Sequence, residues 1–373
     1  MNITEVFKEK QTSVTGRLKH LLDQNLPVIV TGAGNLGKKI ASFLVKQNLN
    51  FYSFTDNNPK RWGQKINNKT ILSPADVSID LKETAVWIVG IWSPGHSYVS
   101  TKHQLQSLGV TNIFPAAALM QLFPGDLLPH YHFQTPEYFL QHKGEIKEVF
   151  ENLADEESKK QFLAHVDCRI NLNFEGLPPA DTANQYFPSD VVSLSTNEVF
   201  LDAGAYDGDT LKDFTSRTNN RFIKYLALEP DPVNCQKLQH VSSSYKDGIV
   251  EVFPYAVGAE NTTLKFDATG GAGAGFSTDG SIEVECKRVD DFFYDYKPTY
   301  LKFDIEGAEL DALKGSEKTI ETYRPKLAVC IYHLPDDLWR IFIYLHKTFP
   351  FYSFFARTHQ FDGLDFVLYA IPK

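Results

Sequence analysis

The chain has 373 residues, with 37 basic against 46 acidic side chains, and a formal net charge of -9. A protein that coats nucleic acid needs clustered lysine and arginine to displace counterions from phosphates, so this balance argues against that role. It leaves room for a local basic site, and we expect no nucleic-acid partner. Apolar residues make up 43% of the chain, which is typical of a globular protein and excludes extended disorder. At roughly 100 to 200 residues per domain, the length predicts two domains and a smaller third element.

The N-terminal segment carries charges throughout and lacks the apolar core of a signal peptide, so we expect a cytoplasmic protein. The longest stretch without acidic or basic residues, His103 to Gly125, is interrupted by polar residues and proline and does not predict a membrane-spanning helix. No CxxC pair is present, so we expect the cysteines to be reduced and mostly buried. They are Cys168, Cys235, Cys286 and Cys330.

The N-terminal third shows a strand, a turn, a helix and a second strand in order. A β-branched run, Val28 to Val30, leads into the glycine-rich turn Gly32 to Gly37, and the segment after it has apolar residues on one helical face. The second apolar strand, Phe51 to Phe54, ends just before Asp56. A small parallel sheet is completed by three further predicted elements: a strand over Val86 to Ile91, a helix over His96 to Leu108 and a strand over Asn112 to Phe114.

The spacing of this turn, GxGxxG, fits a dinucleotide fingerprint, in which glycines permit a tight turn and close approach of a pyrophosphate. Asp56 lies 19 residues beyond Gly37, where a carboxylate can accept hydrogen bonds from ribose hydroxyls. We therefore predict a nucleotide or nucleotide-sugar site, with a purely structural role of the glycines as the alternative. The predicted site residues are Gly32, Gly34, Asn35, Leu36, Gly37 and Asp56.

A second strand, turn and helix begin at Val199, after a stretch with helical periodicity between Pro124 and Pro188. The following strand, Lys224 to Leu228, ends at Glu229, so the chain starts a doubly wound α/β sheet twice. We expect three parts. They are a small Rossmann-like domain for a nucleotide or nucleotide sugar over residues 1–120, a helical connector over 121–190 and a second α/β domain over 191–373.

The second turn has the looser spacing GxxxG and carries three carboxylates, at Asp202, Asp207 and Asp209. Carboxylates around a helix N-terminus repel a pyrophosphate but suit a ligand with an ammonium group and a sulfonium charge, as in S-adenosylmethionine. Glu229 lies 21 residues after Gly208, where it can hold both ribose hydroxyls of such a ligand. The turn therefore predicts a methyl-donor site.

Six runs in this half of the chain, in order, resemble the FkbM family of S-adenosylmethionine-dependent methyltransferases: FLDAGAYDGDT, ALEPDP, VFPYAVG, KRVDDFF, YLKFDIEGAELDALKG and RPKLAVCIYHLPDDLW. The resemblance covers Tyr186 to the C-terminus. It implies a seven-stranded sheet with an antiparallel last strand, for which Phe366 to Ile371 is suited, and methyl transfer to a hydroxyl oxygen, often on a sugar. With it we assign the cofactor S-adenosyl-L-methionine to Asp202, Gly204, Tyr206, Asp207, Gly208, Glu229, Ala256 and Val257.

Two N-terminal runs, VTGAGNLGKKIASFL and FTDNNPKRWG, are similar to the small Rossmann-like domain that opens some sugar acyltransferases and some FkbM proteins. In the acyltransferases this domain helps to hold a nucleotide sugar. The resemblance covers roughly residues 25–115 and implies a small-molecule or glycan acceptor, which can be nucleotide-linked. The sequence does not decide between a monomer and a homo-oligomer.

Charged residues stand in a strand that should be apolar on both sides. Side chains point alternately to the two sides of a strand, so Lys302, Asp304 and Glu306 share one side of the predicted strand from Tyr300 to Glu306. Central parallel strands are normally apolar on both sides. We expect Asp304 to position the acceptor and His333, which follows the strand Lys326 to Tyr332, to act as general base. The candidate catalytic set is Asp304, His333 and Lys302.

The alternatives for this set are a structural pair of Lys302 with Asp304 and a turn-capping role for His333. Asp304, Glu306 and His333 could also ligate a divalent ion, but nothing in their spacing demands one, and we assign no metal. The glycine run Gly270 to Gly275 predicts a hairpin loop or a lid.

Two other function classes compete with a methyltransferase. An NAD-dependent oxidoreductase would use the first turn but would leave the acidic second turn unexplained. A nucleotide-sensing binding protein would not need charges in a central strand.

Overall fold

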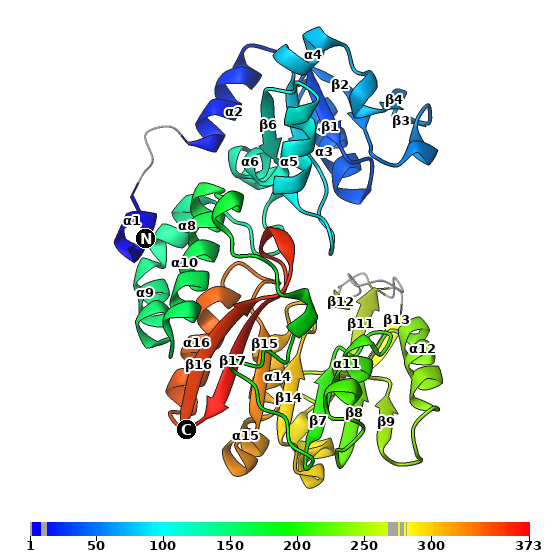
Figure 1. Cartoon of the computed structure of the whole chain (residues 1–373), viewed down its shortest axis with the longest axis vertical. Helices are drawn as coiled ribbons and strands as arrows, with labels where there is room; N and C mark the ends of the chain where they lie inside the picture. Colours follow the sequence, from blue (N-terminus) through cyan, green and yellow to red (C-terminus); the bar gives the residue numbers. More distant parts are fainter. Residues whose placement is uncertain (1, 9–12, 268–274, 277–279, 281) are drawn as a thin grey trace. The chain divides into compact units, whose positions relative to one another are not determined.

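The computed structural model describes residues 2–8, 13–267, 275–276, 280 and 282–373. It forms two compact units, labelled by their elements in Figure 1. Unit 1 comprises Met1–Lys147, Lys160–Ala180 and Gln360–Leu364, and unit 2 comprises Glu148–Lys159, Asp181–His359 and Asp365–Lys373. The chain therefore crosses from one unit to the other at five points, and the expected connector, residues 121–190, is divided between the units.

Unit 1 is built on a six-stranded sheet in the order β3-β4-β2-β1-β5-β6. β1 (Val28–Thr31) is buried along its length and lies parallel to and between β2 (Phe51–Thr55) and β5 (Val86–Val89). Strands buried on both faces are continuous apolar runs, which is why the sequence predicted them. β6 (Asn112–Pro115) extends the parallel part. The hairpin of β3 (Lys65–Ile66) and β4 (Lys69–Leu72) was not predicted, because such short strands show no periodicity.

The strand order of unit 1 reverses between β1 and β5. α3 (Asn35–Lys46) connects β1 to β2 on one side of this point, and α5 (Tyr98–Ser107) connects β5 to β6 on the other. In doubly wound sheets, ligands bind at the carboxyl edge of such a switch point. The other helices before residue 180 are α1 (Ile3–Val6), α2 (Val14–Asp23), α4 (Ile79–Thr84), α6 (Ala116–Leu122), α7 (Pro124–Leu127), α8 (Pro136–Gln141), α9 (Lys143–Asn152) and α10 (Glu156–Asn171).

Unit 2 contains the expected seven-stranded sheet, in the order β16-β17-β15-β14-β7-β8-β9. Five strands are parallel: β7 (Val199–Ala203), β8 (Lys224–Leu228), β9 (Val250–Phe253), β14 (Tyr300–Phe303) and β15 (Lys326–Cys330). β17 (Phe366–Pro372) is antiparallel to its neighbours β15 and β16 (Tyr352–Thr358). This arrangement confirms the predicted Rossmann-like, doubly wound fold with an antiparallel last strand.

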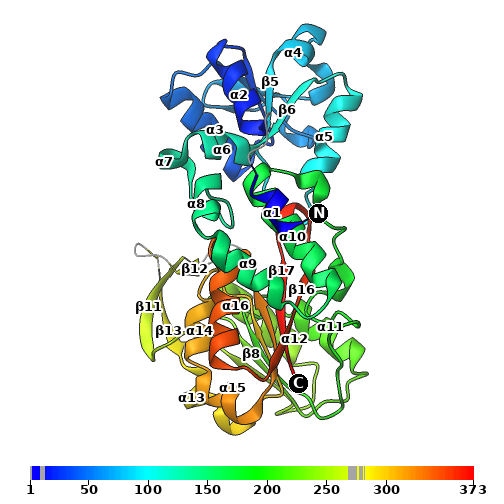
Figure 2. The same ribbon diagram turned by 90° about the vertical axis from the view of Figure 1, so that its left-hand side faces the viewer.

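Helices cover both faces of this sheet. Figure 2 shows α14 (Glu309–Lys314), α15 (Glu317–Tyr323) and α16 (Asp337–Thr348) on one side and α11 (Asp209–Arg217) and α12 (Pro232–Ser242) on the other. This is the arrangement that right-handed crossovers produce on the two sides of a switch point. The short elements are α13 (Val289–Phe292) and the 3-10 turns Pro59–Arg61, Pro74–Asp76, Phe174–Gly176, Thr182–Asn184, Tyr294–Tyr296 and Phe361–Gly363.

A second, four-stranded sheet in unit 2 was not predicted. Its order is β10-β13-β11-β12, with β10 (Tyr255–Val257), β11 (Thr262–Asp267), β12 (Gly275–Phe276) and β13 (Ile282–Lys287). Ala256, Phe266, Val284 and Cys286 form its small core. Of the glycine run predicted as a loop or lid, residues 270–274 lie outside the described part of the chain.

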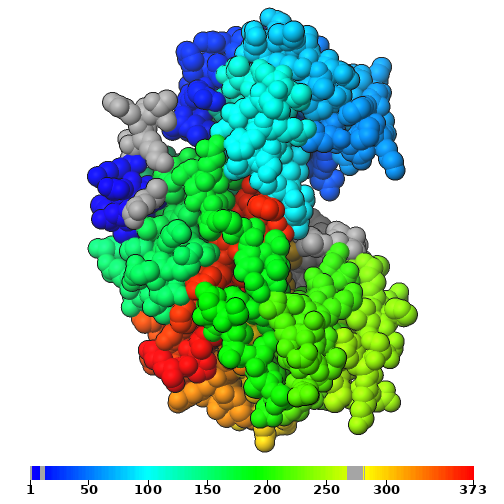
Figure 3. Space-filling view, viewed as in Figure 1, coloured from blue at the N-terminus to red at the C-terminus, as the bar shows by residue number. Residues whose placement is uncertain are grey.

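The loop between β16 and β17, Gln360–Leu364, belongs to unit 1 although both strands belong to unit 2. The Asp362 carboxylate accepts two hydrogen bonds of 2.9 Å from the backbone N–H of Tyr98, at the start of α5. Its Oδ2 also lies 3.3 Å from His96 Nδ1. In the space-filling view, a red patch from this end of the chain borders the cyan surface of unit 1 (Figure 3). Asp362 thus fixes the start of α5 from a distant part of the sequence.

All four cysteines are free and buried, as predicted. None of the helices in the described ranges has both the length and the apolar character that crossing a membrane requires.

Candidate functional site

The glycine turn after β7 lies directly against the loop after β14. Gly204 has φ of +82°, and a Cβ at this position would lie 1.9 Å from the carbonyl oxygen of Asp304. Gly208, with φ of +88°, precedes the first residue of α11. Both backbone conformations favour glycine. The carboxyl edge of the sheet therefore brings the predicted donor turn and the predicted catalytic loop into contact.

Glu229 closes this edge from the end of β8. Its Oε2 accepts a hydrogen bond from the Tyr206 N–H at 2.9 Å, and its Oε1 accepts one from the Asp231 N–H at 2.8 Å. Glu229 is 6% exposed and forms no ion pair with a described basic side chain. Burial raises its pKa to about 7 in spite of these hydrogen bonds. Each carboxylate oxygen still has a lone pair for a further donor.

Asp202 lies inside β7 and pairs with Lys302 of β14. Its Oδ1 accepts a hydrogen bond from Lys302 Nζ at 2.8 Å, and the hydroxyl of Tyr225 donates to Oδ2. Lys302 Nζ also donates to the carbonyl oxygen of Gly204 at 2.8 Å. Burial lowers the pKa of Lys302, but the adjacent carboxylates outweigh it and raise the pKa, so the amine stays charged. This buried pair braces the glycine turn, and the direct partner of Lys302 is Asp202 rather than Asp304.

The other predicted donor residues divide into two groups. Tyr206 and Asp207 lie in the turn itself, where Tyr206 has φ of +47° and Lys237 Nζ lies 5.8 Å from the centre of its ring. Ala256 and Val257 lie in β10 and are 4% and 2% exposed. Their side chains pack in the protein interior.

His333 follows β15 and is enclosed by acidic side chains. Its Nδ1 lies 2.8 Å from Glu309 Oε1, and its Nε2 lies 3.4 Å from Asp304 Oδ1 and 3.9 Å from Glu306 Oε2. The His333 side chain is only 2% exposed. Burial lowers its pKa, but the charges of Glu309, Asp304 and Glu306 outweigh this effect and raise it to about 10.

Asp304 is held as a carboxylate. The Tyr186 hydroxyl donates a hydrogen bond of 2.6 Å to Asp304 Oδ2, and Gln185 Nε2 donates one of 2.9 Å to the Tyr186 oxygen. Burial opposes ionisation, but the charges of Lys302 and His333 together with the Tyr186 hydrogen bond lower the pKa of Asp304. Its side chain is 23% exposed, so solvent or a ligand can reach it.

Glu306 is the third acidic side chain at His333. It has φ of +54°, and its side chain is 26% exposed. Its carboxylate makes no hydrogen bond to a described residue, and burial raises its pKa to about 7. Within the described ranges, no group of three or more His, Cys, Asp or Glu side chains is arranged to hold a metal ion.

In unit 1, packing explains two of the three fingerprint glycines. A Cβ at Gly32 would lie 2.3 Å from Ile91 Cγ1, and a Cβ at Gly37 would lie 1.8 Å from the Gly32 carbonyl oxygen. A Cβ at Gly34 would meet no atom within 4 Å. Asn35 is the first residue of α3. The fold therefore requires Gly32 and Gly37 and leaves Gly34 unexplained.

Asp56 contacts the same turn. Its Oδ2 accepts a hydrogen bond from the Ala33 N–H at 3.0 Å and pairs with Arg61 Nη1 at 3.2 Å. Its Oδ1 accepts one from the Asn58 N–H at 2.9 Å. Trp62 Nε1 donates to the Asp56 carbonyl oxygen at 2.6 Å, while the Trp62 residue is 42% exposed. Asp56 and Glu229 thus play one architectural role, in which a carboxylate after the second strand ties down a glycine turn.

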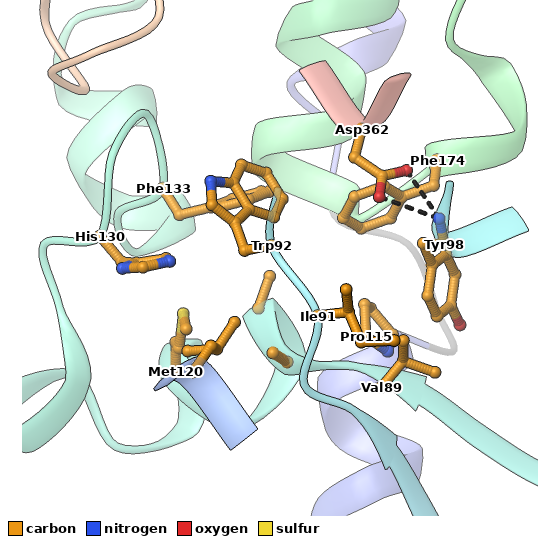
Figure 4. A pocket seen from close by; sticks show the side chains of 13 residues that line it. Val89, Ile91, Trp92, Tyr98, Pro115, Met120, His130, Phe133, Phe174 and Asp362 are labelled. Carbon is orange, nitrogen blue, oxygen red and sulfur yellow. Dashed lines mark hydrogen bonds between the residues drawn. The ribbon is translucent and has the colours of Figure 1, made fainter. Parts of the chain in front are cut away.

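A small pocket lies at the carboxyl ends of β5 and β6 (Figure 4). Its volume is about 10 Å³, which is room for about one water molecule. In a doubly wound sheet the second half of a dinucleotide crosses to this side of the switch point. Side chains occupy that position in unit 1, among them Leu36, Ile91, Trp92, Met120, His130 and Phe133.

The family model described as Methyltransferase FkbM domain matches residues 202–367. Residues 202–367 are therefore similar to an FkbM methyltransferase domain. The matched region begins at Asp202 in β7 and ends at Val367 in β17, so it includes the donor turn, Glu229 and the loop that encloses His333.

A solved structure shows the same fold. The Methyltransferase FkbM from Methylobacillus flagellatus KT is 20% identical, with a TM-score of 0.82 over 99% of this chain and 98% of that chain. Two other structures match with TM-scores below 0.5. Fibrillarin from Aeropyrum pernix, in complex with natively bound S-adenosyl-L-methionine, has a TM-score of 0.32 at 12% identity over 51% of this chain and 73% of that chain. UDP-D-quinovosamine 4-dehydrogenase from Vibrio fischeri has a TM-score of 0.22 at 23% identity over 28% of this chain and 87% of that chain. No curated protein sequence matches the chain.

The sequence did not lead us to Tyr186 or Glu309, and it suggested Glu306 only as a neighbour of Asp304 and a candidate ligand of a divalent ion. Tyr186 is separated from Asp304 by 118 residues, and no local pattern marks it. Glu306 and Glu309 lie in the same sequence run as Asp304, so the close spacing of these three acidic residues could have indicated that all of them belong to the site.

Proposed function

We propose that the chain is an S-adenosylmethionine-dependent O-methyltransferase that acts on a hydroxyl of a sugar or glycan precursor. The observation that carries the proposal is the direct contact of the Gly204 turn with the Asp304 loop inside an FkbM methyltransferase domain. S-adenosylmethionine supplies a methyl group that is activated by a sulfonium charge. Positioning an acceptor oxygen beside that methyl group accounts for much of the rate of such a displacement.

The residues of the turn fit this donor. Glu229 is a buried carboxylate that pairs with no basic side chain in the part of the chain that the structure describes, and its remaining lone pairs suit two ribose hydroxyls. Gly204 and Gly208 have the positive φ angles, +82° and +88°, that shape the turn. Asp207 adds negative charge at the turn, which suits an ammonium group. Asp202 supports the turn through Lys302 and acts on the donor only indirectly.

The acceptor side suits a neutral hydroxyl. Asp304 is ionised and partly exposed, so it can accept a hydrogen bond from an acceptor O–H. A carbohydrate offers several such hydroxyls, and the resemblance to the FkbM family favours this class of acceptor. The direct test is to incubate the protein with S-adenosylmethionine and a panel of free monosaccharides and UDP-sugars. Formation of a methylated sugar and S-adenosylhomocysteine supports the proposal, and methylation of none of the panel contradicts its carbohydrate part.

Replacing Glu229 by glutamine is expected to weaken S-adenosylmethionine binding. Hydrogen bonds to a charged acceptor contribute about 1 to 3 kcal/mol, so the affinity should fall roughly 5-fold to 150-fold. The wild-type affinity should increase as the pH rises through about 7, because only the ionised carboxylate accepts both hydroxyls, whereas the variant should lose this dependence. Calorimetric titration at pH 6, 7 and 8 measures both effects. The exposed Glu321→Gln is the control, and an unchanged affinity of Glu229→Gln would remove this residue from the donor site.

We also propose that unit 1 holds one nucleotide, as the nucleoside diphosphate part of a nucleotide sugar. Gly34 leaves its side of the turn open, and Trp62 offers a partly exposed ring fixed beside Asp56 and Arg61. Side chains leave only about 10 Å³ in the pocket beyond β5, where the second half of a dinucleotide would bind. This disfavours a dinucleotide and therefore the oxidoreductase alternative. These observations support a mononucleotide on the β2 side of the switch point.

Replacing Gly34 by alanine should leave the fold intact and reduce the affinity for UDP-sugars by about 10-fold or more. The new methyl group meets no protein atom within 4 Å, but it covers the backbone that a pyrophosphate must approach. Gly125→Ala is a matched control, because it also adds a methyl group in open space. Titration of the full chain with UDP-sugars and with NADH measures binding. Equal affinities in the two variants, or a wild type that binds only NADH, would contradict this proposal.

A further inference from the structure

The loop after β14 and the first residue of α14 supply three acidic side chains around one histidine, and the roles of these four groups differ. Glu309 is fully buried, and its Oε1 accepts hydrogen bonds from the Ile305 N–H at 2.9 Å and the Gly307 N–H at 3.4 Å. The same oxygen lies 2.8 Å from His333 Nδ1. Glu309 therefore fixes both the loop and the imidazole ring.

His333 cannot serve as the general base expected from the sequence. Its two nitrogens face carboxylates, Glu309 on one side and Asp304 and Glu306 on the other. Its buried Nε2 nevertheless makes no hydrogen bond to any residue in the described ranges. A ring enclosed by three carboxylates keeps both of its protons near neutrality, as its pKa of about 10 indicates. A protonated imidazole has no lone pair to accept a proton.

Asp304 is a weak proton acceptor for a related reason. The Tyr186 hydroxyl donates to one of its oxygens, and the His333 ring lies beside the other. Both contacts stabilise the ionised form and lower its pKa. Asp304 is therefore suited to orient an acceptor O–H rather than to take its proton.

Glu306 has the properties that the other groups lack. Its carboxylate makes no hydrogen bond to a described residue, and its side chain is 26% exposed. The preceding residue, Ile305, borders the donor turn, because a Cβ added to Gly204 would lie 3.4 Å from the Cγ2 atom of Ile305. Glu306 is therefore next in sequence to a residue that contacts this turn. Its φ of +54° is uncommon for a residue with a long side chain, and such strain often marks functional sites.

We propose that Glu306 is the catalytic base that removes the proton of the acceptor hydroxyl, with His333 as a fixed cation that positions Asp304 and Glu306. This inference rests on the proposed function. The acceptor oxygen forms a bond to the methyl carbon while the bond of that carbon to sulfur breaks, and the hydroxyl proton moves to the Glu306 carboxylate. The products are a methyl ether, the neutral thioether and a protonated Glu306, which returns its proton to water. No other reactant is needed.

The charged groups that face Glu306 predict how its titration responds to substitution. They are His333, Asp304, Glu309 and Asp365. Removing the His333 cation should raise the pKa of Glu306 above about 7, because a nearby positive charge favours the ionised form. Removing the Asp304 charge should lower it. The activity of the wild type should rise with pH through about 7, where Glu306 ionises.

The first test measures turnover and donor affinity with whichever sugar of the monosaccharide and UDP-sugar panel is methylated. Glu306→Gln should keep the wild-type affinity for S-adenosylmethionine, lower turnover by about 10²-fold to 10⁴-fold and lose the rise in activity near pH 7. His333→Gln should shift that rise to higher pH, and Asp304→Asn should shift it to lower pH. Glu321→Gln is the surface control. A Glu306→Gln variant with wild-type turnover, or with an unchanged pH profile, would overturn the proposal.

The second test needs no acceptor and therefore separates this inference from the proposed function. Carboxyl and imidazole NMR titrations of the wild type and of Glu306→Gln should show a glutamate resonance that titrates near pH 7 and is missing from the variant. The His333 ring should titrate near pH 10. A Glu306 carboxyl that titrates below pH 5, or a His333 ring that titrates near 6.5, would overturn the assignment even if methyl transfer is shown. A wild type that binds no S-adenosylmethionine would instead contradict the proposed function itself.

Discussion

Replacing Lys302 by methionine is expected to lower the free energy of unfolding by about 3 to 5 kcal/mol, because the variant keeps a buried carboxylate without its cation. Asp202 is 0% exposed and Lys302 is 1% exposed, so water cannot replace the lost partner. The Gly204 carbonyl oxygen also loses a hydrogen bond of 2.8 Å. Urea denaturation of the wild type and the variant measures the difference.

The matched control is the double variant Asp202→Leu with Lys302→Met. Replacing both members of a buried ion pair by apolar residues is often close to neutral, so the double variant should be more stable than the single one. If the double variant also binds S-adenosylmethionine, neither charge contacts the donor. A single variant as stable as the wild type would show that the pair contributes nothing to the fold.

Replacing Gly204 by alanine is expected to cost about 3 kcal/mol or more of stability and to abolish donor binding. The φ of +82° disfavours any side chain, and the new Cβ would lie 1.9 Å from the Asp304 carbonyl oxygen. A backbone atom cannot rotate away as a side chain can, so the turn and the loop after β14 must separate. Chemical denaturation and donor titration measure the two effects.

Gly248 provides a control that isolates the clash. Its φ is +75°, but a Cβ there would meet no atom within 4 Å. Gly248→Ala should therefore show only the conformational cost of about 1 to 2 kcal/mol. If the two variants were equally destabilised, the close contact between the donor turn and the Asp304 loop would have no energetic weight.

Much of the fold was predictable because buried parallel strands consist of consecutive apolar residues. β1, β2 and β8 were placed within about a residue of their observed bounds, and β7 begins at Val199 as expected. The antiparallel β17 was expected from the family resemblance. The four-stranded sheet with β10 was missed, since its strands are short and partly exposed and show no clear period.

The candidate site was only partly predictable, because pairing across strands is not visible in a local pattern. Alternation placed Lys302 beside Asp304 on one side of a strand, but β14 already ends at Phe303. The register of the sheet instead sets Lys302 opposite Asp202 of β7. In the same way, the charge state of His333 depends on Glu309, whose proximity to the ring follows only from the folded loop.

The loop that carries Asp362 also has a consequence for synthesis. The ribosome must add 264 residues after Tyr98 before the carboxylate that binds the start of α5 exists. The buried core of unit 1 further includes Cys168, Leu172 and Phe174. Unit 1 therefore cannot finish folding while it is the only part translated, in contrast to the usual order in which N-terminal domains fold first.

Because the chain crosses between the units at five points, recombination at a single position cannot exchange one unit for that of a relative.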